Sequence, residues 1–211
     1  MMLKTVTSKI ILANIIAFFI GSLLLLLKLP IDFIALRPSS VLAGKYVWTI
    51  FTSIWMHGGF LHLFVNMFSL LFIGSFVERL VGSKRFFRIF LISGIVGSLL
   101  FVFLSALFPG PWFGYPSAAA VGASGAIFGL GGMLAVLTPK LPVYIMLIPI
   151  PMPMWFGITF MLIVFWLLSA FAGLPIGNAA HLGGFLAGLA YAIYLRKRYK
   201  RRARAIARYF R

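Results

Sequence analysis

Six apolar stretches divide the sequence, and each is long enough, or nearly long enough, to cross a lipid bilayer. They cover residues 10–27, 60–77, 86–107, 124–137, 155–172 and 179–195. A membrane-spanning helix needs about 20 apolar residues, and soluble domains contain about 45–50% apolar residues. Because 63% of the residues here are hydrophobic, the sequence predicts an all-α membrane protein with six transmembrane helices. We expect one domain, residues 1–211, with its core at about 9–195 and a basic tail at 196–211.

Positive charge lies mainly outside these stretches. The formal net charge is +17, with only two acidic side chains, Asp32 and Glu78. Basic residues fill the tail and the loop of residues 78–85 between the second and third stretches. A nucleic-acid-binding tail is the alternative, but cations directly after a span are typical of anchors that meet anionic lipid headgroups. We therefore expect a multi-pass protein of the cell membrane, with both termini in the cytoplasm and no nucleic acid partner.

Polar residues open three of the stretches that begin on the outer side of the membrane. His62 and Asn66 lie near the start of the second stretch, Ser124 opens the fourth, and His181 lies near the start of the sixth. Ionisable and polar side chains at this depth are costly and usually mark a functional site. Because the three stretches run in the same direction, these residues should lie at one level. The sequence therefore predicts a single polar site in the outer half of the membrane.

A serine and a histidine at one level indicate nucleophilic chemistry, because a serine hydroxyl needs a neighbouring base. His62 and Asn66 are four residues apart, so a helix presents both on one face. At the start of a helix, Ser124 would lie beside unpaired backbone N–H groups that stabilise a developing oxyanion. Glu78 lies at the opposite end of the second stretch and Asp32 in the first loop. The sequence thus predicts a Ser–His dyad without an acidic partner.

Each of these residues also has a purely structural interpretation. Ser124 is an acceptable helix N-cap. His181 would serve as a satisfied polar residue between helices, and His62 with Asn66 as interhelical hydrogen-bonding groups. Three histidines can also bind zinc, but His57 and His62 are five residues apart, which suits one helix face poorly. With no cysteine in the sequence, we expect no metal and no other cofactor.

Three motifs of this sequence resemble those of the rhomboid family of intramembrane serine proteases. They are HGGFLHLFVN at residues 57–66, GASGAIFG at 122–129 and AHLGGFLAG at 180–188. The resemblance extends over about residues 9–195 and implies the six-helix prokaryotic form of the fold. A GxSG motif alone is a weak signal, but its combination with the two histidine motifs is specific.

The resemblance implies a role for each residue of the motifs. Ser124 would be the nucleophile and His181 the general base, and His62 and Asn66 would complete the oxyanion hole with the Ser124 backbone N–H. Three further residues would support the site, and they are His57, Gly122 and Phe128. Phe128 stands where the family more often has a tyrosine.

Two other family features appear in altered or similar form. Trp48-Thr49 replaces a Trp-Arg pair of the first loop, so the bracing role of that arginine is open. Glu78-Arg79 resembles the polar pair that closes the cytoplasmic end of the second span.

The resemblance also implies the activity and the partners. The chain would be a serine endopeptidase that cleaves transmembrane segments of single-pass proteins within the lipid bilayer. The alternative is a non-catalytic relative that binds transmembrane helices, although such relatives usually lack the serine or the histidine. A transporter would need charges within the spans or an inverted repeat, and the sequence contains neither apart from Arg88 at the edge of the third stretch.

Overall fold

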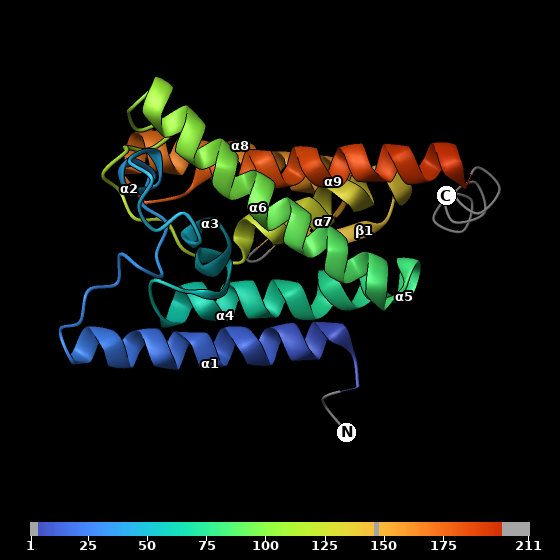
Figure 1. Ribbon diagram of the computed structural model, residues 1–211. Helices are drawn as coiled ribbons and strands as arrows, with labels where there is room; N and C mark the ends of the chain where they lie inside the picture. The colour runs from blue at the N-terminus through green and yellow to red at the C-terminus, as the bar shows by residue number, and fades with distance from the viewer. Residues whose placement is uncertain (1–3, 146–147, 200–211) are drawn as a thin grey trace.

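A computed structural model describes residues 4–145 and 148–199, apart from the side chain of residue 149. Most of the described chain is helical (Figure 1). The elements, in chain order, are α1 (Val6–Leu26), α2 (Pro38–Leu42), α3 (Thr49–Thr52), η1 (Ser53–Trp55), α4 (Phe60–Ser69), η2 (Leu70–Gly74), α5 (Ser75–Val81), α6 (Ser83–Leu107), α7 (Ser124–Leu137), β1 (Pro142–Ile145), β2 (Ile148–Pro153), α8 (Met154–Ala172) and α9 (Asn178–Arg198). The predicted basic tail lies outside the described residues from residue 200 onward.

The predicted membrane architecture is largely confirmed. In the described part of the chain, four helices are long and apolar enough to cross a membrane: Val6–Leu26, Phe60–Val81, Ser83–Leu107 and Met154–Ala172. The fourth predicted stretch forms the shorter helix α7, of 14 residues. The sixth coincides with α9, which has 21 residues but a basic last turn. The chain is therefore an all-α, multi-pass membrane bundle, and the count of six spans stays a prediction.

Helix α7 lies at the centre of this bundle. It packs against α6, α8 and α9, and most of its residues are buried. Figure 1 shows α6 crossing in front of α7. In that view α8 and α9 lie on one side of α7, and α4 and α1 lie on the other. At about 1.5 Å per residue, 14 residues span about 21 Å, less than the hydrocarbon core of about 30 Å. The start of α7 can therefore lie below the membrane surface.

Glycines bring the backbones of α7 and α9 into direct contact. A Cβ atom at Gly184 would collide with the Gly125 carbonyl oxygen, and one at Gly188 would collide with that of Gly129. A Cβ atom at Gly132 would also collide, less severely, with the carbonyl oxygen of Phe185. The small-residue surfaces that the sequence offers on these two stretches thus face one another, as close packing of membrane helices requires.

The carboxylate of Glu78 fixes the start of α1. It accepts hydrogen bonds from the backbone N–H groups of Val6 and Thr7, both at 2.8 Å, and from the Thr7 hydroxyl at 2.6 Å. The hydroxyl of Ser83 donates to it at 2.7 Å. The first N–H groups of a helix lack intrahelical acceptors, so Glu78 satisfies two of them. The predicted closure of this end of the bundle therefore consists of a carboxylate that joins α1, α5 and α6.

The loop between α1 and α4 is ordered by contacts with the segment that precedes Ser124. Leu36 and Ala120 exchange two backbone hydrogen bonds, of 3.0 and 2.7 Å. The Arg37 guanidinium lies 2.8 Å from the Asp32 carboxylate and also donates to the Ser117 carbonyl oxygen. Arg37 thus braces the two loops. Where the family has its loop arginine, the buried Thr49 hydroxyl instead donates to the backbone.

Two local features have no counterpart in our sequence analysis. Strands β1 and β2 form an antiparallel hairpin between α7 and α8. A π-turn, η2, interrupts the long helix Phe60–Val81. The hairpin residues are apolar and proline-rich, so their sequence lacks the alternation that normally indicates a strand.

We expect Gly188→Ala to destabilise the bundle by about 1–3 kcal/mol, because the added methyl group overpacks the α7–α9 contact. The measurement is the free energy of unfolding in mixed detergent micelles. Gly59→Ala is the control, since nothing lies within 4 Å of the added Cβ at that extended position. Equal stability of the two variants would contradict the packing described here.

We expect Arg37→Ala to loosen the loop that leads to α7. Loss of the charged hydrogen bond to Ser117 should speed amide hydrogen exchange in residues 116–122 by about 3- to 10-fold. Lys45→Ala, an exposed change in the same loop, should leave that exchange unaltered. Unchanged exchange in Arg37→Ala would mean that the backbone pairing alone holds the loop.

Candidate active site

Ser124 and His181 meet at the N-terminal ends of α7 and α9. Ser124 is the first residue of α7, and His181 lies in the first turn of α9. The Ser124 Oγ and the His181 Nε2 are 2.8 Å apart. Ser124 does not serve as the N-cap, since Ala123 holds that position. The geometry therefore brings the two predicted residues within hydrogen-bonding distance, although 57 positions separate them in the sequence.

Aromatic rings hold the imidazole of His181 from the sides. The Phe128 ring stacks on it, with centroids 4.5 Å apart and an interplanar angle of 26°. The Phe165 ring of α8 lies 5.7 Å away in a tilted arrangement. His181 is only 5% exposed, and its Nδ1 has no hydrogen-bond partner among the described residues. Packing, rather than a carboxylate, therefore sets the orientation of this ring.

His62 lies over the backbone that leads to Ser124. A Cβ atom at Gly122 would come within 2.8 Å of the His62 ring, so only glycine leaves room for it. The φ angle of Gly122 is +130°, a conformation that other residues rarely adopt. The Gly122 N–H donates to the Ser53 carbonyl oxygen at 2.9 Å. This contact fixes the strand-like segment next to the candidate nucleophile.

Asn66 is buried one helical turn beyond His62, on the same face of α4. Its Nδ2 donates to the carbonyl oxygen of His62 at 2.8 Å. An amide nitrogen carries two N–H groups, so one of them remains available to a reacting group. His62 and Asn66 thus form a polar pair on the helix that faces the start of α7.

His57 packs against His62 from the preceding loop. The centroids of the His57 and His62 rings are 5.1 Å apart, in an edge-to-face arrangement. Burial lowers the pKa of His57 to about 3, and the neighbouring His62 adds to the effect. The His57 ring is therefore neutral at physiological pH.

Three residues that contribute to this site could not be inferred from the sequence pattern. They are Phe165, which touches the His181 ring from α8, and Ser53 and Arg37, which hold the segment before Ser124. Phe165 is one of 23 phenylalanines, and nothing in its sequence neighbourhood distinguishes it. For Arg37 the sequence offers one hint, which is its nearness to Asp32, one of only two acidic residues in the sequence.

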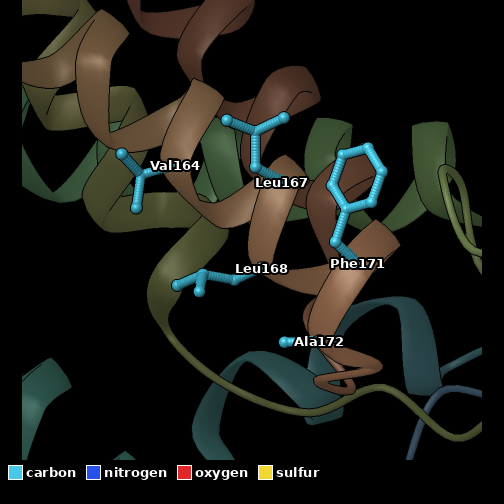
Figure 2. A pocket seen from close by; sticks show the side chains of 5 residues that line it. All are labelled: Val164, Leu167, Leu168, Phe171 and Ala172. Carbon is cyan, nitrogen blue, oxygen red and sulfur yellow. The ribbon is translucent and has the colours of Figure 1, made fainter.

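A shallow apolar depression on α8 is separate from these residues. It is lined by Val164, Leu167, Leu168, Phe171 and Ala172, whose side chains are shown in Figure 2. No polar side chain borders it. The depression therefore suits acyl chains and offers no group for chemistry.

Within residues 4–145 and 148–199, no three His, Cys, Asp or Glu side chains lie close enough together to hold a metal ion. The expectation of a metal-free, cofactor-free site stays a prediction.

Comparison with known proteins gives the family. The family model described as the Rhomboid domain matches residues 44–198. RHOMBOID-like protein 1 of Arabidopsis thaliana is 38% identical over 78% of this chain and 39% of its own length. Rhomboid protease GluP of Bacillus subtilis (strain 168) is 36% identical over 72% of this chain and 27% of its own length.

One of the similar proteins is named as inactive. Inactive RHOMBOID-like protein 8 of Arabidopsis thaliana is 34% identical over 66% of this chain and 36% of its own length. This chain thus spans less than half the length of each of these three relatives. Since the matched domain covers most of the residues, and the motifs of α4, α7 and α9 fall within it, the chain belongs to the rhomboid family.

Proposed function

We propose that this protein is an intramembrane serine endopeptidase in which Ser124 is the nucleophile and His181 the general base. The observation that carries this proposal is the 2.8 Å separation of the Ser124 Oγ and the His181 Nε2. A neutral imidazole accepts the hydroxyl proton as the oxygen attacks a carbonyl carbon. The identity of the family, which includes the rhomboid protease GluP, agrees with this assignment.

The reaction would pass through an acyl-enzyme. As the Ser124 oxygen bonds to the scissile carbonyl carbon, its proton moves to His181 Nε2. The imidazolium then protonates the leaving amine, and the peptide C–N bond breaks. A water molecule next attacks the ester, with His181 again taking the proton, and the serine is regenerated. No carboxylate takes part, because Asp32 and Glu78 are bound to other groups.

Charge on the tetrahedral intermediate would be stabilised by donors around the start of α7. The first N–H groups of α7 have no intrahelical acceptor and point toward that space. His62 and the second N–H of Asn66 supply side-chain donors from α4. Gly122 has no side chain, so the substrate backbone can approach this group of donors closely.

The substrates we propose are transmembrane segments of single-pass membrane proteins. A peptide bond inside an intact helix has its backbone groups paired and its carbonyl shielded, so the segment must unwind near Ser124 before attack. Phe165 on α8 covers the His181 ring, so a substrate would reach this ring from the α8 side of the bundle. We also propose that the protein resides in the cell membrane with both termini cytoplasmic, although some relatives are named mitochondrial.

The alternative is a non-catalytic relative that binds transmembrane helices without cutting them. Inactive RHOMBOID-like protein 8 makes this alternative concrete. The contact between Ser124 and His181 favours the enzyme, because a helix-binding protein has no need of a hydroxyl paired with an imidazole.

We expect Ser124→Ala to abolish both cleavage of a transmembrane reporter and covalent labelling by a fluorophosphonate probe. The variant loses the only proposed nucleophile, while the fold should survive removal of one hydroxyl. Labelling and cleavage are measured on purified protein in detergent. Ser98→Ala, a buried serine change on α6, is the matched control and should retain both. Turnover by Ser124→Ala at the control rate would end the proposal.

We expect Asn66→Ala to lower kcat by about 10- to 1,000-fold, because one oxyanion donor is lost. Asn14 provides a matched control, since its Nδ2 makes the same bond to the carbonyl four residues earlier, at 2.8 Å, and it is equally buried. Asn14→Ala should therefore reproduce any loss of stability caused by removing the buried amide, without lowering kcat. If the two variants lose activity equally, Asn66 acts through stability and not through the oxyanion.

A further inference from the structure

The cytoplasmic-type end of the bundle carries positive charge that this chain does not neutralise. The sequence has 19 basic side chains of Lys and Arg and only two acidic ones. Asp32 pairs with Arg37, and Glu78 accepts four hydrogen bonds from α1 and Ser83. No acidic side chain is therefore left for the cations at the ends of α6 and α9. Their counter-charge must come from another molecule.

Two of these cations are held at one aromatic ring. Arg85 is the third residue of α6, and its guanidinium lies 5.0 Å from the ring centroid of Tyr199 and donates to the Tyr199 hydroxyl at 3.3 Å. Arg198, the last residue of α9, lies 5.9 Å from the same ring and donates to the Tyr194 hydroxyl at 3.2 Å. A guanidinium has five N–H donors, so each retains several for a ligand.

The surroundings of this pair are those of a membrane–water interface. Arg85 opens an apolar helix and Arg198 closes another, so both lie where the spans emerge. Tyr194 is 50% exposed on the face of α9 that carries Arg198. Ile92, 46% exposed, lies seven residues after Arg85 and thus on the same face of α6. An exposed apolar flank therefore continues from the two guanidinium groups toward the membrane centre, and tyrosine is typical of this level.

We propose that Arg85, Arg198 and Tyr199 form a binding site for the phosphate of an anionic phospholipid. The guanidinium groups would bind the phosphate oxygens through paired N–H donors, the geometry in which arginine binds phosphate most strongly. The acyl chains would lie along Ile92 and the aliphatic flank of α9. A phospholipid whose headgroup carries no cation has a net negative charge and would neutralise part of the positive charge of the two arginines. Phosphatidylcholine has no net charge, because its choline group balances its phosphate, and it would leave that positive charge in place. This site is independent of the proposed proteolysis.

The site favours a lipid over a nucleic acid or a free anion. A nucleic acid backbone would need cations directed away from the bilayer, whereas this pair adjoins exposed apolar side chains. Inorganic phosphate would gain the guanidinium contacts but none of the contacts with Ile92. The experiment therefore contains all three ligands.

The test uses the purified full chain in detergent micelles doped with phosphatidylglycerol or phosphatidylcholine, with bound lipid counted by native mass spectrometry. The wild type should retain phosphatidylglycerol in preference to phosphatidylcholine. R85Q/R198Q should bind phosphatidylglycerol about 30-fold more weakly, the effect of removing two cations at a membrane surface. Tyr199→Phe keeps both charges and the ring but loses the hydroxyl, and should weaken binding by about 2- to 5-fold.

The control removes two charges from the same end of the bundle at other positions. Arg79 and Lys140 are exposed on α5 and in the loop after α7, and R79Q/K140Q should bind phosphatidylglycerol within a small factor of the wild type. Equal losses in R85Q/R198Q and R79Q/K140Q would mean diffuse attraction and overturn the site. Equal binding of the two lipids, displacement by millimolar phosphate, or displacement by a short RNA would also overturn it. An unchanged unfolding midpoint for R85Q/R198Q in lipid-free micelles excludes misfolding as the cause of a loss.

Discussion

Direct backbone contact between α7 and α9 is the constraint on which the candidate site depends. Gly125 and Gly184, and then Gly129 and Gly188, meet without side chains between them. Helices that carried larger residues would lie farther apart, and a serine and a histidine on them would not reach one another. Because lipid provides no hydrophobic drive for helices to associate, close van der Waals packing of this kind is a main source of cohesion in the bundle. The same packing therefore stabilises the fold and brings Ser124 within hydrogen-bonding distance of His181.

The scarcity of acidic side chains explains several otherwise separate features. Glu78 is used entirely to cap α1 and join it to α5 and α6, and Asp32 is used to hold Arg37 between two loops. Neither remains to orient His181, so the Phe128 and Phe165 rings fix the imidazole by packing. Neither remains for the arginines at the ends of α6 and α9. Both acids of the sequence are thus engaged in structural contacts, and neither is a hydrogen-bond partner of His181 among the described residues.

Rigidity around Ser124 comes from loops as well as from helices. The pairing of Leu36 with Ala120, the contact of Gly122 with Ser53 and the Arg37 bridge all lie within a few residues of the start of α7. They hold the approach to the site in an extended form with its glycine at positive φ. Groups held in this way need little rearrangement when another molecule contacts them. From α8, by contrast, the contact with His181 is made by the Phe165 ring, which also packs against Phe128.

The sequence by itself determined the class of protein, the approximate ends of the membrane helices and the residues that meet at the site. It did so because apolar length indicates which segments can span a membrane, and polar residues within such segments are rare enough to mark a site. Only the tertiary structure decided the β1–β2 hairpin, the π-turn, the use of Glu78 as a cap and the parts played by Arg37, Ser53 and Phe165. These features depend on contacts between residues far apart in the chain, and such contacts leave no local pattern of spacing or hydropathy.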